Sequence, residues 1–144
     1  MTITRIKKIT SSLLGVANSL QPLWWLVVRL AIASVFFKSG LTKIEDFDMT
    51  LDLFRDEYSV PLLPPYYAAV SSTFFELAMP VALVLGFATR LAALPLLAMT
   101  AVIEFTYQHH MEHMYWAILL TGIVLHGAGK FSLDHLIAKR LAAA

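Results

Sequence analysis

Four apolar stretches, each close to the length of a membrane-spanning helix, are the feature that most constrains this chain. A helix needs about 20 mainly apolar residues to cross the hydrocarbon core of a bilayer, and the stretches run from about 23–40, 67–87, 91–107 and 114–128. Hydrophobic residues make up 58% and charged residues 15% of the sequence, against about 45–50% and about 25% in soluble domains. A small chain cannot hide that much apolar surface from water. The sequence therefore predicts an all-α fold, an integral membrane four-helix bundle that forms a single transmembrane domain over residues 1–144.

The basic residues of the predicted loops are distributed unevenly, and this distribution predicts the orientation. Cytoplasmic loops carry an excess of lysine and arginine. With four spans, one side of the membrane receives Arg5, Lys7, Lys8, Arg90, Lys130, Lys139 and Arg140. The other side receives Lys43 and Arg55. We therefore expect both termini in the cytoplasm, and we expect the first span to remain in the mature protein because no signal-peptide cleavage site follows it.

The connection between the first two spans, residues 45–57, has the pattern of an amphipathic helix. Apolar residues recur every three or four positions at Phe47, Leu51, Phe54 and Tyr58, with acidic residues between them and prolines after them. We expect an outer helix that lies in the membrane interface. Two interpretations stay open, a lid over the bundle and a surface for a partner or an entering substrate.

Four charged residues fall inside the predicted spans, where insertion costs about 2.5–3.5 kcal/mol each and a partner is expected. Counting helical rise from the cytoplasmic ends pairs Arg29 with Glu76 and Lys38 with Glu104. One interpretation is an ion-pair network that fixes the register of the bundle. The other is a polar site between helices, where a quinone carbonyl accepts a hydrogen bond or a glutamate takes a proton.

The turn between the last two spans, residues 108–113, is rich in histidine. On a helix, His109, Glu112 and His113 would share one face, and with His110 they form a candidate site for copper or zinc. The alternative is a solvated polar turn that binds no metal.

Several classes of function are excluded or disfavoured by composition. The chain has no cysteine, so it holds no thiolate metal site and no iron–sulfur cluster. A net charge of +1 gives no reason to expect nucleic acid as a partner. We expect the lipid bilayer, self-association, or another membrane or periplasmic redox protein as partners, and not a complete oxidoreductase in this chain alone.

Several short motifs, in order along the chain, resemble those of the DoxX family of small bacterial four-span membrane proteins. They are Arg29-Leu30-Ala31, Gly40-x-x-Lys43-Ile44, Glu76, Gly86-Phe87-x-Thr89-Arg90-Leu91-Ala92-Ala93 and Gly127-x-Gly129-Lys130-x-Ser132-Leu133-Asp134. The resemblance implies a multi-pass protein of the bacterial inner membrane. It also implies an association with membrane redox metabolism, because the namesake relatives are subunits of a thiosulfate:quinone oxidoreductase.

The resemblance carries over a candidate polar site at Arg29, Glu76 and Arg90. Three functions therefore remain open. The first is an accessory subunit of a quinone-linked redox system, with quinone bound near Glu76. The second is a membrane component of metal handling or stress defence that uses the outer histidines, and the third is a non-catalytic anchor or assembly factor.

Overall fold

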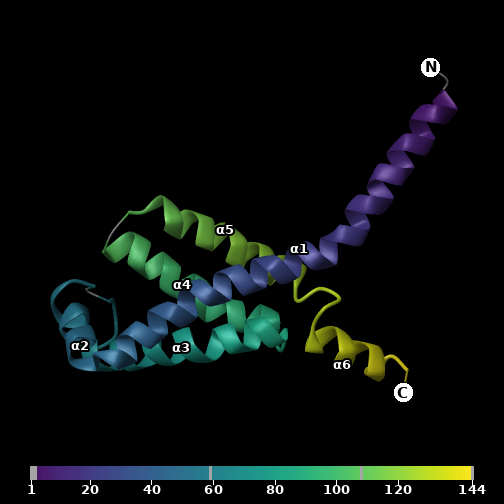
Figure 1. The fold of residues 1–144 in the computed structure, drawn as a ribbon. Coiled ribbons are helices and arrows are strands. Elements are labelled where there is room, and N and C mark those ends of the chain that lie inside the picture. Colours follow the sequence, from purple (N-terminus) through teal and green to yellow (C-terminus); the bar gives the residue numbers. More distant parts are fainter. Residues whose placement is uncertain (1–2, 59, 108, 144) are drawn as a thin grey trace.

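The chain folds into helices joined by short connections, and the described residues contain no strand. The computed structural model describes residues 3–58, 60–107 and 109–143. The helices, in chain order, are α1 (Ile3–Glu45), α2 (Phe47–Asp56), α3 (Pro65–Leu85), α4 (Thr89–Thr106), α5 (Met111–His126) and α6 (Leu133–Leu141) (Figure 1). The predicted all-α fold is confirmed. Gln108, which belongs to the predicted histidine-rich turn, lies outside the described residues.

Three of the helices, α1, α3 and α4, are long and apolar enough to cross a membrane. The 16 residues of α5 span about 24 Å, less than the roughly 30 Å of a hydrocarbon core. Large apolar side chains face outward on several helices, among them Phe105 at 82% exposure and Leu125 at 74%. Such exposure suits contact with lipid. The chain is a helical membrane protein, while the fourth span and the cytoplasmic termini remain predictions.

The core forms where α1 packs along α3 and where α4 packs along α5. Its buried residues alternate between bulky side chains, such as Ile32 and Leu96, and small ones, such as Ala33 and Ala93. Small residues let membrane helices approach each other closely. A Cβ atom on Gly40 would lie only 2.9 Å from the Leu77 side chain, so α1 and α3 are in contact at this level.

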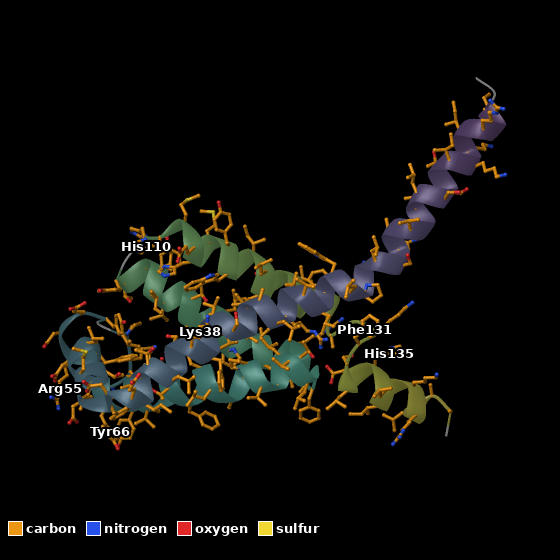
Figure 2. All side chains as sticks on the ribbon, in the orientation of Figure 1. Lys38, Arg55, Tyr66, His110, Phe131 and His135 are labelled. Carbon is orange, nitrogen blue, oxygen red and sulfur yellow. The ribbon has the colours of Figure 1, made fainter. Side chains whose placement is uncertain are left out.

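The two ends of the bundle are named here after the short helices beside them. The α2 end contains α2, the loop that follows it and the turn between α4 and α5; the α6 end contains the turn between α3 and α4 and the segment that leads into α6. Figure 2 shows Arg55, Tyr66 and His110 at the α2 end and Phe131 and His135 at the α6 end. Any ligand site must be placed at one end or between the two.

The predicted amphipathic helix is confirmed as α2, and it covers the first turns of α3. Its buried Phe54 packs against Ala68 and Ala69, with Phe47 and Leu51 around them. The Asp46 side chain accepts a hydrogen bond from the Met49 N–H and so caps the helix. Of the two interpretations, the lid is the one these contacts support.

Candidate functional site

A buried ion pair joins the last turn of α1 to the middle of α3. The Lys43 ammonium lies 2.7 Å from a Glu76 carboxylate oxygen, and the two side chains are 14% and 2% exposed. Lys43 also donates a hydrogen bond of 2.8 Å to the Ser39 hydroxyl. The predicted pairing of Arg29 with Glu76 is therefore wrong. It assumed that the first span ends near Gly40, whereas α1 continues to Glu45 and brings Lys43 level with Glu76.

A cavity of about 220 Å³ lies beside this ion pair, between α3, α4 and the lid. By the lid we mean α2 together with the loop that follows it. We call this cavity the lid cavity. Its walls are mostly apolar and include Phe54, Phe75 and Met99; its polar lining groups are Lys43, Tyr58, Ser71, Ser72 and Thr106. Small-molecule sites commonly combine apolar walls with a few polar groups that fix orientation. The volume is below the roughly 300 Å³ of drug-sized sites, so the cavity suits a single ring rather than a large ligand.

Tyr58, in the loop after α2, lines the lid cavity and has a perturbed hydroxyl. Burial raises the pKa of its hydroxyl above the ordinary value, and the negative charges of Glu76 and Glu57 raise it further. The neutral phenol, a hydrogen-bond donor, is therefore the form present at neutral pH. Its ring makes edge contacts with Phe54 and Tyr107 at centroid distances of 4.9 and 4.8 Å. Those contacts hold the hydroxyl beside the lid cavity.

Arg29 belongs to the α6 end, far along α1 from Lys43. Its side chain is fully buried, and its guanidinium donates a hydrogen bond to the Phe131 carbonyl. The adjacent Asp134 carboxylate accepts hydrogen bonds of 2.7 Å from the Ala88 N–H and 3.0 Å from the Thr89 N–H. The Arg29 hydrogen bond joins α1 to the segment before α6, and the Asp134 hydrogen bonds join the first turn of α6 to the start of α4.

The other two cationic candidates make weaker contacts. Arg90 is exposed and donates a long hydrogen bond of 3.5 Å to the His126 carbonyl. Lys38 is also exposed, and Figure 2 shows it midway along the bundle. The structure brings neither residue to Glu76.

Glu104 contacts the histidine-rich turn, and its predicted pairing with Lys38 is wrong. Its carboxylate oxygens lie 3.2 Å from His109 Nδ1 and 3.0 Å from His113 Nδ1. The physical reason is that α4 places Glu104 at its last turn, beside the start of α5 and away from the exposed Lys38.

The predicted metal ligands are only partly on one helix. Because α5 begins at Met111, Glu112 and His113 are helical, while His109 and the N-cap His110 precede the helix. Within the part of the chain that the structure describes, no group of three or more His, Asp or Glu side chains is arranged to hold a metal ion. Binding of copper or zinc at this turn stays a prediction.

Lys43 is the site residue that reasoning from the sequence missed. The predicted span boundary places Lys43 in a loop, although it stands in the motif Gly40-x-x-Lys43. The motif indicates that Lys43 faces α3, because Gly40 and Lys43 lie about one helical turn apart. The close approach of α3 at Gly40 therefore places α3 beside Lys43 as well.

The fold and the site together define a helical membrane protein with a buried charge pair beside an apolar cavity. The family model DoxX matches residues 24–109, more than half of the chain, and the chain therefore belongs to the DoxX family. No curated protein and no solved structure matches the sequence. The matched region includes Lys43, Glu76 and every lining residue of the lid cavity.

Proposed function

We propose that this chain binds the head group of a quinone in the lid cavity and acts as an accessory subunit of a quinone-linked redox system of the bacterial inner membrane. The observation that carries the proposal is the buried Lys43–Glu76 ion pair beside an apolar cavity between membrane helices. An ionisable residue inside a membrane protein is a functional-site hypothesis by default. A quinone has an apolar ring and polar carbonyl oxygens, the combination that this cavity matches.

The polar lining of the cavity supplies hydrogen-bond donors for those carbonyl oxygens. The Lys43 ammonium has three N–H donors, and its contacts with described residues, to Ser39 and Glu76, use two of them. The third is left for a ligand. The neutral Tyr58 hydroxyl is a second donor from the lid. The Glu76 carboxylate keeps the ammonium in place and balances its charge.

The electrons for quinone reduction are assigned to a partner protein. Conversion of a quinone to a quinol takes up two electrons and two protons, and this chain has no cysteine for an iron–sulfur cluster. A membrane or periplasmic redox protein would supply the two electrons, water at the membrane surface would supply the two protons, and this chain would hold and orient the ring.

A binding titration tests the proposal. The purified chain in mild detergent is titrated with a short-chain benzoquinone by equilibrium dialysis. A hydrogen bond from a charged donor contributes about 1.5–3 kcal/mol, so Lys43→Met should weaken binding about tenfold to a hundredfold. Lys38→Met is the matched control, because Lys38 lies on the same helix but is exposed, and it should leave binding unchanged.

The proposal fails if folded Lys43→Met protein binds as tightly as the parent chain. It also fails if natively purified protein carries no quinone and Glu76→Gln leaves membrane electron transfer unchanged. If a partner protein co-purifies with the parent chain and with every one of these variants, and no quinone is bound, the anchor or assembly function would be favoured instead.

A further inference from the structure

The first half of α1 extends away from the bundle. Every described side chain from residue 3 to residue 21 is exposed, and Figure 1 shows this half projecting beyond the other helices. We call residues 3–21 the N-terminal arm. The 43 residues of α1 amount to about 65 Å of helix, roughly twice the thickness of a hydrocarbon core. The arm therefore has to lie outside that core or along its surface.

The arm has one apolar face. Side chains three and four positions apart lie on the same side of a helix, and Ile6, Ile9, Leu13, Val16 and Leu20 follow that spacing. They are 49–65% exposed, although they are among the most hydrophobic residue types. A continuous apolar face of this kind requires a partner or a lipid phase.

The opposite face is polar and basic. It carries Lys7, Ser11 and Asn18, with Lys8 at its edge and Leu14 as its one large apolar residue. Arg5 lies at the border of the apolar face, because it is four positions before Ile9. The arm contains no acidic residue. A helix with a basic polar face and an aliphatic apolar face has the composition of helices that lie in the membrane interface. Clusters of lysine and arginine next to a membrane span are attracted to anionic lipids.

The junction between the arm and the bundle allows a change of direction. Pro22 lies inside α1, where its ring removes one backbone hydrogen bond and favours a bend. Figure 1 shows α1 bending between its free first half and its packed second half. Trp24, 60% exposed, follows the bend, and tryptophan is enriched at the boundary between lipid and water.

We infer that the N-terminal arm docks on the surface of an anionic lipid bilayer. Its apolar face would enter the boundary of the acyl chains, and Arg5, Lys7 and Lys8 would contact lipid phosphates. The spacing of the apolar residues also fits a coiled coil with a second copy of the chain. Charge favours lipid, because three cations without an acidic partner attract an anionic membrane and repel a parallel copy. The arm is also covalently joined to a membrane span, so a lipid surface is always within reach.

Spin labelling of the full chain tests this inference, and the absence of native cysteine makes single-cysteine variants unambiguous. Leu13→Cys labels the apolar face and Ser11→Cys labels the opposite face. Each protein is reconstituted in phosphatidylcholine vesicles with or without phosphatidylglycerol. With the anionic lipid, we expect the label at 13 to collide more with oxygen than with a water-soluble nickel chelate, and the label at 11 to show the reverse.

Substitution of Arg5, Lys7 and Lys8 by glutamine should reduce or abolish the lipid signature at position 13 in anionic vesicles. The inference is overturned if both labels are equally accessible to water in those vesicles. It is also overturned if the label at 13 shows spin–spin broadening that disappears on dilution with unlabelled protein, because a second copy would then cover the apolar face.

Discussion

Each end of the bundle contains a cation contributed by α1, fully buried Arg29 at one end and partly buried Lys43 at the other, and the two cations have different surroundings. At the α6 end, Arg29 is fully buried, bonded to the Phe131 backbone and packed near Gly86. At the α2 end, Lys43 is paired with Glu76 and lines a cavity. A buried charge in a membrane bundle is thus not a ligand site by itself. Free volume beside the charge distinguishes a candidate binding site from a structural contact.

Cavity size alone would place the ligand at the α6 end. A larger, more open hollow of about 730 Å³ lies at the α6 end and is lined by Arg90, Lys130 and Asp134. The Asp134 carboxylate is already bonded to the first backbone N–H groups of α4. The lid cavity is smaller, but it lies beside the Lys43–Glu76 ion pair and has mostly apolar walls, and we place the ligand there for these two reasons.

The largest effect is expected when the ion pair at the α2 end is broken. Removing one partner of a buried pair costs about 3–5 kcal/mol, whereas replacing both by apolar residues of similar volume is often neutral. We expect Glu76→Met to destabilise the protein by about 3–5 kcal/mol and the double variant Lys43→Met, Glu76→Met to recover most of that loss. Thermal unfolding in detergent measures both.

The double variant separates a structural role of the pair from a functional one. We expect it to fold and to have lost quinone binding. A stable double variant that binds quinone like the parent chain would show that the pair only fixes the register of α1 and α3.

At the α6 end, the tightest position is Gly86. It adopts a positive φ of 68°, and a Cβ atom there would lie 2.2 Å from Arg29 Nη1 and 2.4 Å from the Ser132 Cβ. Left-handed backbone costs a non-glycine residue about 1–2 kcal/mol and overpacking about 1–3 kcal/mol. Gly86→Ala should therefore lower stability by roughly 2–5 kcal/mol in the same unfolding assay.

Two other glycines serve as controls for that substitution. Gly129 also has a positive φ, of 73°, but a Cβ there would meet its nearest neighbour, Trp25 Cβ, at an ordinary 3.7 Å. Gly129→Ala should cost only the backbone strain. Gly15, in the N-terminal arm, has no neighbour within 4 Å, and Gly15→Ala should be neutral or stabilising by up to about 1 kcal/mol. Equal losses of stability in Gly86→Ala and Gly129→Ala would contradict the tight packing of Gly86 against Arg29.

The Asp134 cap should have an intermediate effect. Loss of a helix cap costs about 0.5–2 kcal/mol, so Asp134→Ala should reduce stability by about 1–2 kcal/mol while leaving quinone binding at the α2 end unchanged. Asp56→Ala, at an exposed acidic residue of α2, should change stability by less than about 0.5 kcal/mol. Weakened quinone binding in Asp134→Ala would show that the two ends are not independent.

The smallest effect on stability is expected when the tyrosines at the lid, Tyr58 and Tyr107, lose their protons at alkaline pH. Burial and the Glu76 and Glu57 charges raise the pKa of Tyr58, and a hydrogen bond to the Glu57 carboxylate raises the pKa of Tyr107. The folded lid therefore holds these protons more tightly than the unfolded chain. Its contribution to stability is fully present below about pH 10, the ordinary tyrosine pKa, and is lost as the pH rises through the raised values.

Ultraviolet absorbance of tyrosinate measures this titration. Glu57→Gln should lower the apparent pKa of Tyr107 and, less strongly, that of Tyr58. Identical titration curves for the parent chain and Glu57→Gln would contradict the contact between the lid and Tyr107.

Much of the fold could be predicted from the sequence because its signals are local. The spacing of Phe47, Leu51 and Phe54 predicts an amphipathic helix, and α2 forms there. Length and hydropathy indicated the long helices. Such signals depend on neighbours within a few turns of the same helix.

The partners of the buried charges could not be predicted in the same way. Glu76 was identified as a site residue, but its partner depends on where α1 ends and how it packs on α3. Arg29 bonds to Phe131, 102 residues further along the chain, and no local pattern indicates that contact. Counting depth along ideal helices pairs Glu76 with Arg29, whereas its partner in the structure, Lys43, lies about four helical turns further along α1.

Photo-crosslinking tests the central claim, a quinone head group in the lid cavity, most directly. The purified chain is irradiated with a short-chain azidoquinone, and the modified peptides are identified by mass spectrometry. The account predicts modification at lid-cavity residues such as Phe54, Tyr58 and Phe75, suppressed by excess unlabelled quinone and absent from the double variant Lys43→Met, Glu76→Met. Modification confined to the α6 end, or undiminished in the folded double variant, would contradict it.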